Sequence, residues 1–318
     1  MEFIIALIPA LCWGSLGILS TKFGGNSSQQ TLGLTLGGLI FGLVSYFFWV
    51  LPNGYYLDAT IIIIGLISGV LWTVGQAYQF VAIKKMGGVS IAVPLSMTSQ
   101  LVGNALLGAA VLGEWSTGAQ WLIGIIAIVL ILIGALLIQA PSKSSDANTD
   151  TTGRNKGLIY IAISTLGFMG YFIAPKLLQI WLNVPANVIN AGGGINYMIA
   201  IIFPQSIGMV IGSFLYIYLI SHETADIFGK VTFKNMITGL VWAVGNIALF
   251  ISIANPVLGQ AVASTLSQLG FIVGALGGIF ILHEAKTKKQ LNFVALGIVI
   301  AVLGAVIISN INMFTNLI

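Results

Sequence analysis

Long apolar runs separated by short polar breaks follow one another along the whole chain. Each run is long enough to form a helix across the hydrocarbon core of a bilayer, which takes about 20 residues. Ten such runs cover residues 3–21, 32–51, 60–82, 89–112, 119–139, 157–178, 195–220, 234–253, 257–282 and 291–310. The pattern predicts an all-α polytopic membrane protein with ten transmembrane helices.

The longest polar stretch lies at the middle of the chain and divides it into two halves. It is rich in Ser, Thr, Asp and Asn and runs over residues 140–156. We expect a first five-helix repeat at residues 1–139, a polar cytoplasmic linker at 140–156 and a second five-helix repeat at 157–318.

Basic residues predict the orientation in the membrane. Eleven of the twelve Lys and Arg residues fall in connections after odd-numbered runs, and only Lys176 follows an even-numbered one. Because basic connections stay on the cytoplasmic side, we expect both termini to lie outside the cell and the two halves to have opposite orientations.

The second half of the chain repeats a pattern of the first. Gly69, Trp72, Gly75, Gln76 and Phe80 recur at the same spacing as Gly239, Trp242, Gly245, Asn246 and Phe250. Residues 99–101 and 267–269 both read Ser-Gln-Leu. Because each half holds an odd number of spans, we expect a 5+5 inverted repeat, which places a site between the halves and supports alternating access. Glycines at four-residue spacing also predict close helix packing.

Composition narrows the class of protein further. Of 318 residues, 58% are hydrophobic and 6% are charged, whereas a soluble globular protein has about a quarter charged residues. Short connectors leave no room for a catalytic domain outside the membrane. The net charge of +4 is explained by the basic connections and does not indicate a nucleic-acid surface. The single cysteine, Cys12, cannot form an intramolecular disulfide.

Ionisable side chains are missing from the centres of the predicted spans. All eight Asp and Glu residues and both His residues fall at span ends or in connectors. The sequence therefore predicts no metal cluster, no cofactor and no catalytic acid–base pair, so an enzyme is a poor interpretation. A neutral substrate is favoured, because proton relays and cation sites usually need a buried ionisable group.

Uncharged amides and aromatic rings gather inside the predicted spans. A sugar fits this mixture because its hydroxyls donate and accept hydrogen bonds while its C–H faces stack on rings. The candidate substrate-binding residues are Trp13, Trp72, Gln76, Gln100, Asn104, Tyr171, Gln205, Trp242, Asn246 and Gln268. The alternative for each amide is a hydrogen bond between helices, and for Trp13 it is core filling.

Glu114 and Glu284 close the fourth and ninth spans at equivalent positions of the repeat. Each is a candidate for either proton coupling or a structural role. In the structural role, the carboxylate accepts from backbone N–H groups at the start of a neighbouring helix.

Several segments carry a family resemblance over nearly the whole chain. They are 6–10 leading into Trp13-Gly14-Ser15, 22–25, 30–33, 65–76, 99–101, 112–115, 205–209, 242–246 and 267–269. Together they resemble the bacterial glucose/ribose porter family of the drug/metabolite transporter superfamily. The resemblance implies ten helices, a bacterial plasma-membrane location and uptake of glucose or ribose by proton symport. The segment from Lys176 to Asn196 looks longer than the family's usual connection.

We favour a monosaccharide uptake permease whose partners are its sugar, protons and the lipid bilayer, without nucleic acid. The sequence does not decide whether the protein forms a homo-oligomer, nor whether the sugar is glucose or ribose. One alternative is an exporter or exchanger of another neutral metabolite. The other is a membrane sensor or assembly subunit that binds a ligand without moving it.

Overall fold

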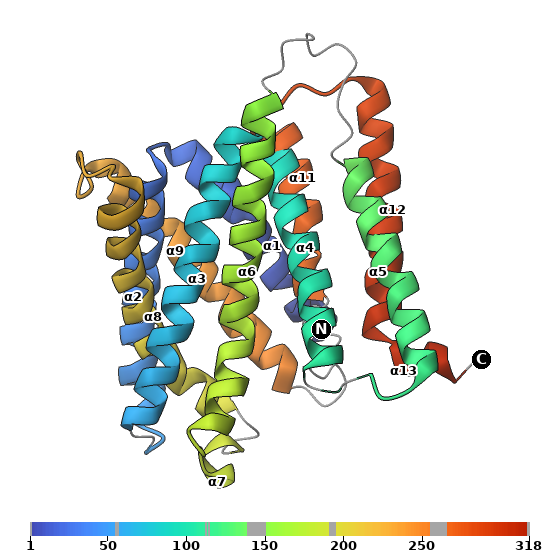
Figure 1. Cartoon of the computed structure of the whole chain (residues 1–318). Coiled ribbons are helices and arrows are strands. Elements are labelled where there is room, and N and C mark those ends of the chain that lie inside the picture. Colours follow the sequence, from blue (N-terminus) through green and yellow to red (C-terminus); the bar gives the residue numbers. More distant parts are fainter. Residues whose placement is uncertain are drawn as a thin grey trace.

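The computed structural model describes residues 2–54, 57–111, 113, 115–138, 151–190, 195–254 and 266–316. Within these ranges every regular element is a helix, and the helices form one bundle (Figure 1). They are α1 (Glu2–Phe23), α2 (Ser27–Ser45), η1 (Tyr46–Val50), α3 (Ala59–Lys85), α4 (Val89–Ala110), α5 (Gly118–Ile138), α6 (Thr151–Trp181), α7 (Ala186–Ile189), α8 (Ile195–Tyr216), η3 (Ile217–Ser221), α9 (Lys230–Ala254), α11 (Gly270–Phe280), α12 (Lys288–Ser309) and α13 (Ile311–Thr315).

Eight helices in the described part are long and apolar enough to cross a membrane. They are Ile4–Phe23, Ser27–Val50, Ala59–Lys85, Val89–Ala110, Gly118–Ile138, Gly153–Trp181, Ile195–Ser221 and Lys288–Ser309. The all-α polytopic class is thereby confirmed. The expected eighth and ninth spans correspond to α9 and to the apolar helix Leu266–Phe280, which are not among the eight. Residues 257–265 lie outside the described residues, and the count of ten stays a prediction.

α2 begins at Ser27, earlier than the apolar run that predicted it from residue 32. A capping box starts the helix: Gln29 N–H donates to the Asn26 side chain at 2.9 Å, and Asn26 N–H donates to the Gln29 side chain at 3.1 Å. These bonds satisfy amide groups that a helix start otherwise leaves free. The first turns are buried although they are polar, because Ser27 contacts the Tyr216 hydroxyl at 2.9 Å. Apolar periodicity alone therefore placed this start too late.

α6 is longer at both ends than the predicted span 157–178. It begins at Thr151, so the last part of the predicted linker 140–156 is helical, while residues 139–150 lie outside the described residues. It continues to Trp181, which places Lys176 inside the helix and not in a connection. A helix satisfies its own backbone hydrogen bonds, so it can extend past the apolar run. The short helix α7 follows within the segment that looked unusually long.

Most of the closest helix pairs have a counterpart when the two halves of the chain are compared. α3 packs against α6 and α8, and α9 packs against α1 and α2. α4 contacts α6 as α11 contacts α1, and α2 with α8, α4 with α11, and α5 with α12 form direct pairs. The helices α1, α2, α3, α4 and α5 can be matched in order with α6, α8, α9, α11 and α12. Under this matching, each of these pairs becomes another pair of the set or stays the same pair. α5 and α12 run side by side at one edge of the bundle (Figure 1).

Glycines form the tightest of these helix contacts. A Cβ on Gly69 of α3 would collide with the backbone of Gln205 and Gly208 in α8. In the matching pair, a Cβ on Gly239 of α9 would collide with the backbone of Leu34 and of the glycines at 37 and 38 in α2. The predicted role of glycine in close helix packing is confirmed at these positions.

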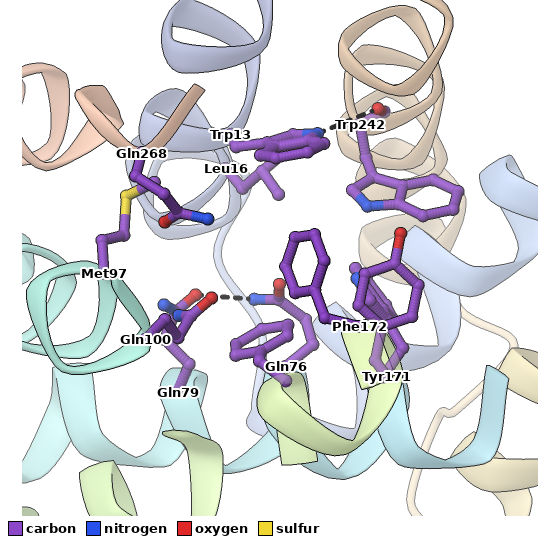
Figure 2. A pocket seen from close by; sticks show the side chains of 12 residues that line it. Trp13, Leu16, Gln76, Gln79, Met97, Gln100, Tyr171, Phe172, Trp242 and Gln268 are labelled. Carbon is purple, nitrogen blue, oxygen red and sulfur yellow. Dashed lines mark hydrogen bonds between the residues drawn. The ribbon is translucent and has the colours of Figure 1, made fainter. Parts of the chain in front are cut away.

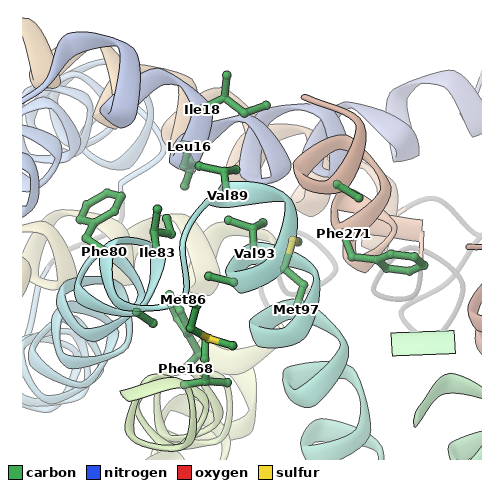
Figure 3. Packing of buried hydrophobic residues seen from close by; sticks show 14 of the residues in the cluster. Leu16, Ile18, Phe80, Ile83, Met86, Val89, Val93, Met97, Phe168 and Phe271 are labelled. Carbon is green, nitrogen blue, oxygen red and sulfur yellow. The ribbon is translucent and has the colours of Figure 1, made fainter. Parts of the chain in front are cut away.

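The largest apolar cluster joins helices from both halves. Leu16 of α1, Phe80 of α3, Met97 of α4, Phe168 of α6 and Phe271 of α11 are all buried in it (Figure 3). Tight packing of this kind holds the helix backbones at fixed positions. Leu16, Met97 and Phe168 also border a pocket beside the cluster, so the core positions the candidate site.

Candidate binding site

Six helical segments surround one pocket. Its lining residues are Trp13, Leu16, Trp72, Gln76, Gln79, Met97, Gln100, Phe168, Tyr171, Phe172, Trp242 and Gln268 (Figure 2). All twelve are uncharged. They come from α1, α3, α4, α6, α9 and the start of the helix Leu266–Phe280, so both halves of the chain contribute.

Aromatic rings form one side of the pocket. The rings of Trp72 and Trp242, equivalent residues of the sequence repeat, lie with centroids 5.0 Å apart and planes inclined by 57°. Phe168 meets Trp72 edge to face, with centroids 6.1 Å apart. Trp13 donates from its indole Nε1 to the Trp242 carbonyl oxygen at 3.3 Å. This contact fixes the Trp13 ring across the pocket from Gln76 (Figure 2).

Two glycines of the repeat make room for these rings. A Cβ on Gly75 would lie 2.7 Å from the ring of Phe168, and a Cβ on Gly245 would lie 2.6 Å from Trp13 Nε1. Both distances are shorter than the contacts that real Cβ atoms make with neighbouring heavy atoms. The glycines therefore set the approach of α6 to α3 and of α1 to α9, and with it the position of the aromatic side.

Amides form the other side of the pocket. Gln76 Nε2 donates to Gln79 Oε1 at 3.1 Å, as drawn in Figure 2. Gln79 Nε2 donates to Ser96 Oγ at 2.9 Å, and Gln100 Nε2 donates to the same oxygen at 3.1 Å. Gln268 lies across from them, and its Oε1 has no partner among the described residues. Buried amides held in this way are preorganised hydrogen-bonding groups.

Most of the candidates from the sequence meet at this pocket. Those that line it are Trp13, Trp72, Gln76, Gln100, Tyr171, Trp242 and Gln268. Gln205 is instead bonded through Nε2 to Ser68 Oγ at 2.8 Å, which joins α8 to α3. Asn104 is half-buried in α4 away from the pocket lining. Asn246 is fully buried outside the lining, and neither polar atom of its side chain has a partner in the described part of the chain.

Several pocket residues were missed by the sequence analysis. Gln79 lies three residues after Gln76, so helical spacing places it near Gln76 on the helix surface, although it falls outside the four-residue spacing of Trp72 and Gln76. Phe168 is apolar and carried no polar signal. Leu16, Met97 and Phe172 are apolar, and nothing in one sequence separates them from core residues.

Glu284 lies outside the pocket and joins α4 to the segment after α11. Val89 N–H donates to Glu284 Oε1 at 2.6 Å, and Ser90 N–H donates to Glu284 Oε2 at 2.9 Å. These amides open α4, so the contact is of the type expected for a carboxylate at a helix start. Burial lowers the pKa of Lys286, two residues on, and the charge of Glu284 opposes that shift. Glu114 lies outside the described residues.

The fold and the pocket define the class. Membrane-spanning helices surround a small site of rings and neutral amides, the arrangement of a transporter for a small polar solute. The family described as Sugar transport protein matches residues 4–311, and the chain belongs to this family of bacterial sugar uptake proteins, which are transporters and not enzymes.

Three relatives show how far the similarity extends. The glucose uptake protein GlcU of Bacillus subtilis is 38% identical over 96% of this chain and 97% of its own length. A putative sugar uptake protein of Lactiplantibacillus plantarum is 35% identical over 97% of this chain and 99% of its own. The putative sugar uptake protein YxfA of Lactococcus lactis is 39% identical over 96% and 97%.

A solved crystal structure with 14% sequence identity shares the fold. It superposes with a TM-score of 0.56 and covers 98% of this chain and 97% of its own. At this level of identity the likeness describes the arrangement of the helices alone.

Proposed function

We propose that the protein carries glucose or ribose into the cell, with the sugar bound in the pocket between two inverted halves that expose it to each side in turn. The observation that carries the proposal is the pairing of an aromatic side with a side of neutral amides in one pocket. Rings cover the C–H faces of a sugar and amides bond its hydroxyls. Glucose is favoured because a relative of 38% identity is named as a glucose uptake protein.

Symmetry supports the inverted repeat in this proposal. Most of the closest helix pairs exchange with one another when the two halves are matched, as described above. α2 and α8, which correspond in this matching, both end in a π-helical turn, η1 and η3. Trp72 and Trp242 also contact each other on the aromatic side of the pocket. Equivalent segments meeting at one site are the arrangement on which alternating access relies.

Location and coupling complete the proposal. We place the protein in the bacterial plasma membrane with both termini outside, on the distribution of Lys and Arg. Proton symport is supported only by the resemblance to the glucose/ribose porters. None of the twelve described residues that line the pocket is a carboxylate, so a coupling proton would bind elsewhere.

Uptake into proteoliposomes tests the function. Purified protein should carry labelled glucose or ribose into liposomes above the level of empty ones. Gln76→Ala should weaken the apparent affinity about fivefold, the factor that one hydrogen bond of about 1 kcal/mol represents. Gln205→Ala is the matched control, because that buried amide bonds Ser68 outside the pocket. Failure to carry any monosaccharide would contradict the proposal.

A further inference from the structure

A chain of hydrogen bonds runs from α6 under the pocket to the amides that line it. Ser164 Oγ donates to the backbone carbonyl oxygen of Gly75 at 2.7 Å, and Ser164 and Ser96 join their hydroxyl oxygens at 3.4 Å. Gln79 and Gln100 both bond Ser96, and Gln76 bonds Gln79. Ser96 and Ser164 are fully buried. These hydrogen bonds thus link α3, α4 and α6 to the side chains on the amide side of the pocket.

The carbonyl at one end fixes the direction of every bond in this chain. A carbonyl oxygen can only accept, so the Ser164 hydroxyl donates its one hydrogen to the Gly75 carbonyl oxygen. The Ser96 hydrogen must then go to Ser164, and Ser96 can only accept from its other two partners. Gln79 and Gln100 must therefore turn their NH₂ groups toward Ser96. Gln79 in turn presents its oxygen to Gln76, which must donate.

The consequence is that two amides offer their oxygens to the pocket. Gln76 Oε1 and Gln100 Oε1 accept no hydrogen bond from the described residues, while their nitrogens are held. Figure 2 shows the Gln76 oxygen on the side away from Gln79. Gln268 differs because its Oε1 has no hydrogen-bond partner among the described residues, so the network does not fix the direction of its amide.

We infer that the pocket recognises sugar hydroxyls as hydrogen-bond donors at two fixed acceptors, Gln76 and Gln100, and that Ser96 is a positioning residue that sets this polarity without lining the pocket. The inference rests on the proposed function and adds the direction of the hydrogen bonds. A hydroxyl that donates to these oxygens cannot be replaced by fluorine, which accepts weakly and has no hydrogen to give. A hydroxyl that only accepts could be replaced in this way.

Competition by sugar analogues measures the direction. Uptake of labelled glucose into proteoliposomes is inhibited with unlabelled glucose and, one ring position at a time, with its deoxy and deoxyfluoro analogues. At two or more positions, the fluoro analogue should compete as poorly as the deoxy analogue, each about three- to tenfold weaker than glucose. Fluoro analogues that match glucose wherever the deoxy analogue is weak would overturn the inference and leave sugar transport standing. If no monosaccharide is carried, the proposed function falls and this inference falls with it.

Variants of the buried serines test the positioning role. Ser96→Ala removes the oxygen that holds Gln79 and Gln100, so both amides can turn. The apparent affinity of the fluoro analogue divided by that of glucose, the fluoro-to-hydroxyl ratio, should then move toward one. Ser164→Ala should shift the ratio the same way from a different helix, because it frees the Ser96 hydrogen. Thr98→Ala is the control: this buried hydroxyl of α4 bonds the Pro94 carbonyl of its own helix at 2.7 Å. An unchanged ratio in both serine variants would overturn the role of the network.

Discussion

Replacing Glu284 by glutamine isolates the contact between α4 and the segment after α11. The carboxylate accepts two backbone N–H groups, from Val89 and Ser90, at 2.6 and 2.9 Å. Glutamine has nearly the same shape but keeps only one acceptor oxygen. Its NH₂ group would face an amide hydrogen that has no other acceptor.

The cost follows from the number and type of the bonds. A hydrogen bond to a charged group contributes about 1.5–3 kcal/mol, more than a neutral one, and a negative charge at a helix start adds about 0.5 kcal/mol. Losing one charged bond and weakening the other gives about 2 kcal/mol for Glu284→Gln. Glu284→Ala, which leaves both amides unpaired, should cost about 3 kcal/mol. For a chain of this size, those costs correspond to thermal midpoints lowered by about 4 and 6 °C.

Thermal unfolding of the purified protein in detergent measures the effect. Ser90→Ala is the matched control, because it keeps the backbone N–H and removes a hydroxyl that has no partner among the described residues. It should leave the midpoint within about 1 °C of the wild type. A glutamine variant that unfolds at the wild-type temperature would refute the stabilising role of the contact.

The same variant separates structure from proton coupling. Sugar uptake and sugar-driven alkalinisation of the medium are followed together in Glu284→Gln and in Glu114→Gln. If the glutamates are structural, both variants lower folded yield or rate while any proton movement stays tied to sugar. A variant that equilibrates sugar but no longer moves protons would identify that glutamate as the coupling site.

The remaining predictions concern packing, topology and substrate charge. Gly69→Ala should cost about 1–3 kcal/mol or abolish folded yield, since its Cβ would meet the backbone of α8. Gly118→Ala should be tolerated, because its Cβ would meet no atom within 4 Å beyond its chain neighbours and its own helix backbone. Equal folded yields of the two variants would contradict this. With Cys12 replaced, a cysteine at Thr315 should react with an impermeant reagent on intact cells, and labelling only after permeabilisation would reverse the orientation. Glucose 6-phosphate should not compete for uptake, because the described pocket residues include no cation for its phosphate; effective competition would contradict a neutral substrate.

The sequence predicted the pocket best where one helix face carried both an amide and an aromatic ring. Trp72 and Gln76 are four residues apart, so α-helical geometry alone places them together, and both line the pocket. Gln205 looked similar but is satisfied by Ser68 of another helix. Which helices become neighbours depends on packing over the whole bundle, and a local pattern does not contain that information.

The repeat predicted equivalent positions but not equivalent surroundings. Asn246 corresponds to Gln76, yet it is buried away from the pocket lining. The glycine before each of them faces a different ring, Phe168 at Gly75 and Trp13 at Gly245. Two halves with different side chains fill matched spaces differently, so a residue cannot be assigned to the site from its counterpart alone.

The Trp72–Trp242 pair gives the protein an optical property of its own. Two indole rings whose centroids are 5.0 Å apart, inclined by 57°, do not absorb light independently. Their coupled transitions produce a circular dichroism signal that changes with the distance and angle between the rings. Trp115 and Trp121 form a second pair with centroids 5.2 Å apart, and Trp121→Phe removes its contribution. The signal that remains reports the distance and angle between one ring of α3 and one ring of α9 at the pocket, without an attached label.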